Sequence, residues 1–231
     1  MHIGIVAGSA EGAALCYRTI AHEGAKHLGL YAHPEVTMNS IPLADYQKHI
    51  DRDDWPAVGD LMLRSAQTLA QAGAAFLICP DNTMHRALPF IDSRSPLPWL
   101  HIAAVVAGEA THRGFHRIGL LGTKWLVASE VYPDQLTARG LHYLRPNENE
   151  REAINRFIMQ ELVNGIFSPA AIACHHQVIA RMKAEGCDAV VLGCTEIPLI
   201  MNDANSPLPT LDSTRLLARA AVLRATNNVS S

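Results

Sequence analysis

The sequence predicts an α/β fold built on mainly parallel sheet. Short apolar runs alternate along the chain with longer amphipathic stretches, which is typical of consecutive βα units. A weak internal duplication relates the first half of the chain to the second, so two similar lobes are expected. The 231 residues are enough for one large α/β domain or two small lobes, and 48% hydrophobic residues supply a substantial core.

The individual elements follow from the apolar runs and from the residues that bound them. Strands are expected at residues 3–7, 36–40, 75–79, 99–102, 118–121, 189–192 and 208–211. Helices are expected at residues 11–28, 56–72, 105–112, 148–164, 169–185 and 213–226. Ser168-Pro169 indicates a helix start, with serine as the cap and proline in the first turn. Gly73 and Gly186 each separate a predicted helix from a predicted strand, as αβ loops commonly require.

The duplication is clearest in the spacing of two pairs of turns. Gly8 follows the first predicted strand, and Gly122 follows a similar strand in the second half. Asp81 comes 73 positions after Gly8, and Cys194 comes 72 positions after Gly122. Any two βα units resemble each other to some degree, but the matched spacing favours a true duplication. Asp81 and Cys194 are then expected in counterpart turns, related by a pseudo-twofold axis.

Four polar turns follow predicted strands, at the edge where parallel sheets bind ligands. They are Gly8-Ser9, Asp81-Asn82-Thr83, Gly122-Thr123 and Cys194-Thr195-Glu196. Each offers backbone N–H groups and a small hydroxyl or amide group at a helix start, which suits a carboxylate ligand. A cleft between the lobes lined in this way suits a small dicarboxylate. Nucleotide binding is disfavoured, because the chain lacks a GxxxxGK[ST] loop and a full dinucleotide fingerprint.

Cys194 and Asp81 are the candidate catalytic residues. Cys194 is expected at a strand-to-helix turn, where a helix N-terminus makes thiolate available at neutral pH. A small core residue is the alternative interpretation of Cys194. Asp81 is a candidate general base, because partial burial is expected to raise the pKa of its carboxyl group toward a useful range. Its alternative role is that of an Asx-turn cap on the helix expected to start near Met84.

Composition argues against several classes of partner. The net charge of −3 without a basic stripe argues against nucleic acid. No apolar run reaches the roughly 18–20 residues of a membrane span, so no membrane partner is expected. The chain starts on a strand-like segment, so no signal peptide is expected. The five scattered cysteines are therefore interpreted as reduced thiols, and the expected compartment is the cytoplasm.

The twelve histidines suggest a metal site, but their spacing does not support one. His112 and His116, and the pair His175-His176, are the nearest approach to clusters, and none has a second ligand group at a recognised spacing. No metal is expected. His85 lies one turn after the polar turn of Asp81 and is expected to fix that loop.

Two segments of the chain resemble turns of a known family. Residues 81–85, Asp-Asn-Thr-Met-His, resemble the CNTxH or TNTMH turn of aspartate/glutamate racemases. Residues 193–197, Gly-Cys-Thr-Glu-Ile, resemble their GCTEI turn. The likeness extends over almost the whole chain and includes the early Gly-Ser turn and residues 100–103, 122–123, 154–155 and 177–181. Because the two turns occur together, in this order and at this separation, the resemblance to the Asp/Glu/hydantoin racemase superfamily is specific.

The resemblance implies a particular architecture and mechanism. It implies two pseudo-symmetric lobes, each a mainly parallel four-stranded sheet flanked by helices, with the active site in the cleft between them. The expected lobes are residues 1–98 plus 208–231 and residues 99–207. It also implies that the enzyme has no cofactor, pyridoxal phosphate included, and forms a homodimer. Family members place two catalytic residues on opposite faces of the substrate's α-carbon, and these correspond here to Asp81 and Cys194.

The substrate implied is a small carboxylate such as aspartate or glutamate. Residues expected to hold its α-carboxylate are Asn82, Thr83, Thr123 and Thr195, with Ser9 and Glu196 at the rim of the cleft. The chain departs from the family pattern at Asp81, where most members have Cys and some have Thr. It departs again at Leu126, where many have Thr.

The function expected from the sequence is that of an amino-acid racemase or epimerase that transfers protons between two bases at the α-carbon. One alternative is a decarboxylase or a cis–trans isomerase of a small dicarboxylic acid, since the scaffold retains a single cysteine in the two turns. The other is a catalytically inactive paralogue that binds a small carboxylate.

Overall fold

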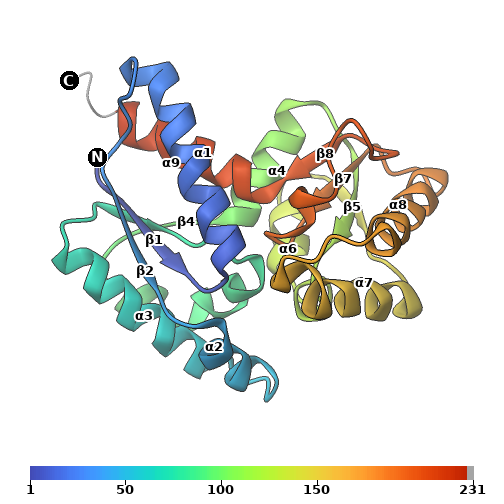
Figure 1. Ribbon diagram of the computed structural model, residues 1–231, viewed down its shortest axis with the longest axis horizontal. Helices are drawn as coiled ribbons and strands as arrows, with labels where there is room; N and C mark the ends of the chain where they lie inside the picture. The colour runs from blue at the N-terminus through green and yellow to red at the C-terminus, as the bar shows by residue number, and fades with distance from the viewer. Residues whose placement is uncertain (228–231) are drawn as a thin grey trace. The chain divides into compact units, whose positions relative to one another are not determined.

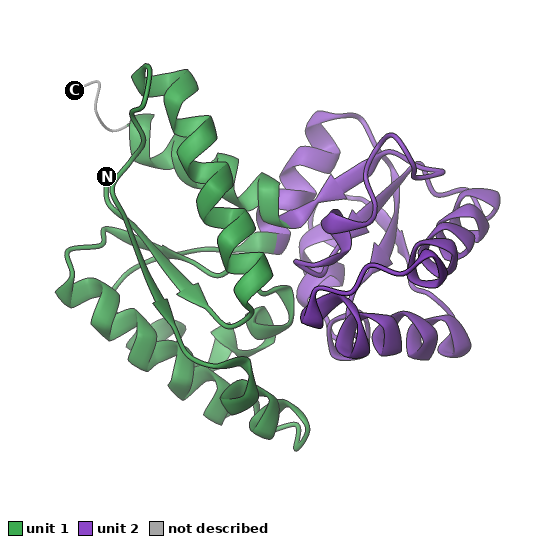
Figure 2. Ribbon diagram, in the orientation of Figure 1, with its two compact units in different colours: residues 1–102, 214–231 green, residues 103–213 purple. Residues whose placement is uncertain are grey.

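Two four-stranded parallel sheets form the framework of the computed structural model, which describes residues 1–227. The strand order is β2-β1-β3-β4 in one sheet and β6-β5-β7-β8 in the other, so the two topologies are identical. Each sheet belongs to its own compact unit (Figure 2). Unit 1 comprises Met1–Ile102 and the segment from Thr214 onward, and unit 2 comprises Ala103–Ser213. The α/β class and the pair of four-stranded sheets are confirmed.

Unit 1 carries the first sheet and its helices (Figure 1). Its elements are β1 (Ile3–Ala7), α1 (Ala10–Leu28), β2 (Val36–Ser40), α2 (Leu43–Ile50), α3 (Trp55–Gln71), β3 (Phe76–Ile78), the 3₁₀ helices η1 (Asn82–Phe90) and η2 (Asp92–Arg94), β4 (Trp99–Leu100) and α9 (Ser213–Asn227). In Figure 1, α1 and α9 lie on one side of this sheet and α3 lies on the other. Because both faces are covered, β1 and β3 are apolar along their whole length and fully buried.

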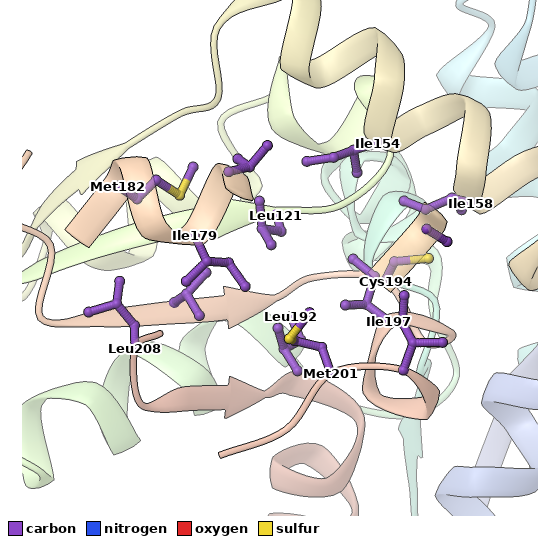
Figure 3. Packing of buried hydrophobic residues seen from close by; sticks show 14 of the residues in the cluster. Leu121, Ile154, Ile158, Ile179, Met182, Leu192, Cys194, Ile197, Met201 and Leu208 are labelled. Atoms are coloured by element: carbon purple, nitrogen blue, oxygen red, sulfur yellow. The ribbon is translucent and has the colours of Figure 1, made fainter. Parts of the chain in front are cut away.

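Unit 2 repeats this plan. Its elements are α4 (Ile102–His112), β5 (Arg117–Leu121), α5 (Lys124–Val127), α6 (Val131–Thr137), β6 (His142–Leu144), α7 (Glu148–Gln160), η3 (Leu162–Asn164), α8 (Pro169–Ala184), β7 (Ala189–Leu192), η4 (Ile197–Leu199) and β8 (Thr210–Asp212). One core cluster joins α7 and α8 to the sheet (Figure 3). Leu121 and Leu192 of the sheet pack there with Ile158 of α7 and Ile179 of α8, and Cys194 belongs to the same cluster.

Caps and glycine turns fix where several helices begin and end. The Ser168 hydroxyl accepts a hydrogen bond from the Ala171 N–H at 3.1 Å, and Pro169 starts α8, as predicted. Gly73 and Gly186 follow α3 and α8 with the same left-handed φ of +89°, which confirms the predicted αβ loops. These two loops lead into β3 and β7, the strands that precede Asp81 and Cys194.

The sequence pattern did not predict several short elements. The edge strand β6 has one exposed and two half-buried residues, so it shows no apolar run. Helices α2, α5 and α6 span only eight, four and seven residues, which is too short for a clear helical period. These elements are placed by tertiary packing.

The units also divide at points other than the predicted lobe boundaries at residues 98/99 and 207/208. β4 pairs with β3 in unit 1, whereas the prediction placed Trp99 in the second lobe. β8 pairs with β7 in unit 2, whereas the prediction placed Thr210 with the first lobe. In each unit the fourth strand completes the sheet before the chain leaves, so the division falls at the start of α4 and of α9.

Two general features of the described helices and side chains bear on function. None of the helices within residues 1–227 has the length and apolarity needed to cross a membrane. Over the same residues, no three His, Cys, Asp or Glu side chains gather as a metal-binding group.

Candidate active site

The first half of the candidate site is the turn that follows β3. The Asp81 Oδ2 atom accepts hydrogen bonds from the N–H groups of Gly8 at 3.1 Å and Ser9 at 3.4 Å. Ser9 is the N-cap residue of α1, so the carboxylate lies at the positive end of that helix. Two backbone donors and the helix dipole favour the ionised carboxylate. Asp81 makes no side-chain cap to the helix it precedes, so the predicted cap role is wrong.

Glycine at position 8 permits this close approach between the turns after β1 and β3. A Cβ atom on Gly8 would overlap the Met84 methyl group and would stand 3.2 Å from Asp81 Oδ2. The order of the sheet places β1 directly beside β3, at the point where successive connections run in opposite directions. The sequence thus determines, through one glycine and one strand order, where the Asp81 carboxylate lies.

Buried polar groups surround Asp81. Tyr46 of α2 is fully buried, and its hydroxyl has no hydrogen-bond partner among the described residues. Burial first, and then neighbouring Cys79 and Asp81, raise the pKa of the Tyr46 hydroxyl. Burial, followed by the charge of Asp81, also raises the pKa of the Cys79 thiol well above its ordinary value. Cys79 therefore stays protonated in the interior.

Two histidines stand behind this turn. The His85 ring nitrogen Nε2 lies 2.9 Å from the Cys79 carbonyl oxygen, which fixes the loop as expected. The His85 and His101 rings meet edge to face with centroids 4.7 Å apart. Burial and then His101 lower the pKa of His85 well below its ordinary value, and burial lowers the pKa of His101 to about 4. Both rings are neutral at pH 7. The sequence offered no signal for Tyr46. For His101 it offered its place directly after β4 and within residues 100–103, which resemble the family.

The second half of the candidate site is the turn that follows β7. The Cys194 thiol donates a hydrogen bond to Glu196 Oε2 at 2.9 Å, and the Thr195 hydroxyl donates to the same oxygen at 2.8 Å. Glu196, predicted at the rim of the cleft, is only 2% exposed. Its carboxylate instead lies against Cys194. A carboxylate beside a thiol favours the protonated thiol over the thiolate.

The helix expected after Cys194 is also shorter than predicted. Only the three-residue 3₁₀ helix η4 follows, with Glu196 as its N-cap residue. A single 3₁₀ turn has few aligned peptide dipoles, so the predicted source of thiolate stabilisation is weak.

Glycines hold the two turns of unit 2 together. Gly193 donates its N–H to the Leu121 carbonyl at 2.9 Å, and a Cβ atom on Gly193 would overlap that same carbonyl oxygen. Leu126 is buried and fills the remaining space, with its Cδ2 atom 2.8 Å from where that Cβ would lie. Thr123 caps α5 by accepting the Leu126 N–H at 3.2 Å.

The predicted site residues thus fall into two sets of equivalent position. Unit 1 brings together Ser9, Asp81, Asn82 and Thr83 at the ends of β1 and β3. Unit 2 brings together Thr123, Cys194, Thr195 and Glu196 at the ends of β5 and β7. In identical topologies, β3 and β7 correspond, so Asp81 and Cys194 occupy equivalent turns.

Comparison with known proteins shows to which family this arrangement belongs. The family of Asp/Glu/Hydantoin racemases matches residues 6–221, which is nearly the whole chain. The chain belongs to this family. It is an amino-acid racemase, and therefore an isomerase, and the match includes both turns that resemble the family's motifs.

Individual members of the racemase family resemble the chain over most of its length. The broad specificity amino-acid racemase RacX of Bacillus subtilis is 23% identical over 198 residues, which cover 82% of this chain and 81% of RacX. A Yersinia pestis structure, provisionally described as an Asp/Glu racemase, is 32% identical with a TM-score of 0.87, covering 97% of this chain and 99% of that one. An aspartate racemase homologue from Pyrococcus horikoshii is 26% identical with a TM-score of 0.83, with the same coverage. None of these descriptions favours the decarboxylase, cis–trans isomerase or inactive-paralogue alternatives.

Proposed function

We propose that this racemase works without pyridoxal phosphate and uses Asp81 and Cys194 as its two acid–base residues. The observation that carries the proposal is their equivalence: each follows the third strand of its unit and is held by a defined hydrogen bond. A racemase needs one group that removes the α-proton and another that returns a proton to the opposite face. Asp81 and Cys194 are the members of the two turns whose chemistry suits these tasks.

The resting protonation states define which group acts first. The backbone donors of Gly8 and Ser9 favour ionised Asp81, so this carboxylate removes the α-proton of one enantiomer. The Cys194 thiol keeps its proton beside Glu196 and delivers it to the other face of the carbanion. The opposite enantiomer reacts from the complementary state, with protonated Asp81 and Cys194 thiolate. One proton is taken and one is given in either direction, so the enzyme ends each turnover in the state that serves the reverse reaction.

The proposed substrates are small amino acids, with aspartate and glutamate as the first to test. Amide and hydroxyl groups that suit the α-carboxylate come from Asn82, Thr83, Thr123 and Thr195. The relative described as a broad specificity amino-acid racemase supports a test that extends beyond acidic side chains. We also propose a cytoplasmic homodimer; the five cysteines without a disulfide fit a reducing compartment. Light scattering on the purified protein tests the dimer.

Solvent exchange in deuterated water tests the proposed function. Each enantiomer of aspartate, glutamate and a panel of neutral and basic amino acids is incubated with the protein. We expect the opposite enantiomer to accumulate with deuterium at its α-carbon, and we expect Cys194→Ala to abolish this. Exchange at the α-carbon is read by proton NMR and enantiomer content by chiral chromatography. Absence of exchange with every amino acid tested would rule out the proposal.

A further inference from the structure

We infer that Lys124 binds the second carboxylate of an acidic amino-acid substrate, so that its ammonium group selects aspartate or glutamate over neutral amino acids. This inference rests on the proposed function and deepens it, because it assigns the choice of substrate class to one side chain. Lys124 directly follows Thr123, one of the residues proposed to hold the α-carboxylate, in the turn after β5.

The turn that carries Lys124 lies against the turn that carries Cys194. The Gly193 N–H donates to the Leu121 carbonyl at 2.9 Å, and a Cβ atom on Gly122 would stand 2.9 Å from the Gly193 carbonyl oxygen. Because β5 and β7 are neighbouring parallel strands, both turns lie at the carboxyl edge of the unit 2 sheet. The four-carbon stem of Lys124 therefore carries a positive charge at the same edge as the thiol.

The Lys124 ammonium has no acidic partner. Within residues 1–227 it forms no ion pair or hydrogen bond with another side chain, and its Nζ atom lies 5.2 Å from the centre of the Trp125 ring. Both residues are half-buried. A partly desolvated cation gains more from a carboxylate than a fully exposed one does. The aromatic ring supports the cation but leaves its charge uncompensated, which suits it to bind an anionic group of a ligand.

Two other cations near the carboxyl ends of strands already have carboxylate partners. Arg145, which follows β6, donates a hydrogen bond to Glu130 at 2.9 Å. Lys48 of α2, in unit 1, lies 2.7 Å from the Asp45 carboxylate. Of these three cations, Lys124 is the one whose charge no described carboxylate meets, so it is the best suited to pair with the substrate.

The backbone of Lys124 is held by bonds that do not involve its side chain. Its N–H donates to the Oδ1 atom of buried Asn155 at 3.0 Å, and Thr123 caps α5 by accepting the Leu126 N–H. Replacing the side chain leaves these hydrogen bonds in place. A substitution at this position therefore tests the charge rather than the fold.

Kinetics with acidic and neutral substrates test the inference. In Lys124→Gln we expect kcat/KM for aspartate and glutamate to fall by about 10- to 100-fold, because a charge-assisted hydrogen bond is lost. For a neutral amino acid that the wild type racemises, kcat/KM should change by no more than about twofold. Lys124→Arg keeps the charge and should retain most of the activity on acidic substrates. Lys48→Gln removes a lysine that is already paired and is the matched control, so it should alter neither value.

Ligand binding gives a second measurement that needs no turnover. Succinate carries two carboxylates on a four-carbon chain, and butyrate carries one. We expect succinate to raise the melting temperature of the wild type more than butyrate does, at equal ionic strength set with sodium chloride. Lys124→Gln should abolish this difference, whereas Lys48→Gln should keep it. The melting curves without ligand show whether each variant is folded.

The outcomes that overturn the inference are distinct from failure of the proposed function. Equal losses on acidic and neutral substrates in folded Lys124→Gln overturn it, as does wild-type activity on aspartate and glutamate in that variant. Succinate that stabilises the wild type no more than butyrate, or that stabilises Lys124→Gln as much as the wild type, also overturns it. If the wild type racemises no amino acid, the proposed function fails, and the succinate measurements still decide whether Lys124 binds a second carboxylate.

Discussion

The turns after β3 and β7 hold their functional residues in opposite ways, although they occupy equivalent places in identical sheets. In unit 1 the carboxylate of Asp81 is the acceptor, and backbone N–H groups at the start of α1 hold it. In unit 2 the thiol of Cys194 is the donor, and a carboxylate side chain holds it. The first arrangement stabilises the deprotonated group and the second stabilises the protonated one. In the proposed mechanism, the two equivalent turns thus supply one base and one acid in their resting states.

The largest expected effect comes from neutralising Asp81, the proposed base of unit 1. Asp81→Asn keeps an oxygen that can accept the N–H groups of Gly8 and Ser9, so the turn should remain folded. The amide cannot remove a proton, and we expect racemisation to fall by about 10² to 10⁴-fold. Chiral chromatography of the product measures the change, and thermal melting checks the fold. Racemisation at the wild-type rate would show that Asp81 is not the base and that the two turns are not functional counterparts.

The second prediction compares how much stability each turn loses when a methyl group is added at its glycine. A Cβ atom on Gly193 would overlap the backbone oxygen of Leu121, which cannot move without disturbing β5. A Cβ atom on Gly8 would overlap the end of the flexible Met84 side chain. We therefore expect Gly193→Ala to lower the free energy of unfolding by about 3 kcal/mol and Gly8→Ala by about 1 kcal/mol.

Urea denaturation measures both glycine variants. Gly108→Ala is the matched control, since nothing lies within 4 Å of the added methyl group and the residue is in α4. Alanine favours a helix over glycine, so the control should be neutral or slightly stabilising. The reverse order of Gly193→Ala and Gly8→Ala would mean that the turn of unit 2 adapts more easily than the backbone contact indicates.

The third and smallest prediction uses the neutral histidines beneath the turn of unit 1. The pKa of His101 is about 4 in the folded protein, against about 6.5 in an unfolded chain. Below pH 6.5 the unfolded chain binds a proton that folded His101 does not, so stability is full above that pH and falls as pH approaches 4. Between pH 7 and pH 5 the loss should be about 2 kcal/mol from this group. His85, whose pKa is also lowered, acts in the same direction.

Melting temperatures at pH 7 and pH 5 check the histidine prediction. His101→Gln removes the titrating group and should reduce the difference between the two temperatures. His112→Gln, which changes an exposed histidine of α4, should leave that difference as it is in the wild type. An equal difference in wild type and His101→Gln would mean that other groups govern the acid sensitivity of unit 1.

Short apolar runs and their flanking residues determined most of the fold. β1, β2 and β7 have the predicted bounds, because each consists of four or five consecutive residues whose pattern is typical of a strand. The sequence also placed Asp81 and Cys194 at strand ends, since a polar turn that follows a buried strand lies at the edge of the sheet. The elements that were missed, β6 and α2 among them, are short or lie at an edge, where local pattern is weakest.

By itself, then, the sequence determined the α/β class, the two equivalent turns and the chemical types of the residues in them. Only the tertiary structure decided what those residues do to one another. It bound Asp81 to Gly8, 73 positions earlier in the chain and just before α1, and it turned Glu196 inward against Cys194. It also closed each sheet with its own fourth strand. The physical reason is that protonation state and strand membership depend on through-space neighbours, which strand order and burial select and local sequence does not encode.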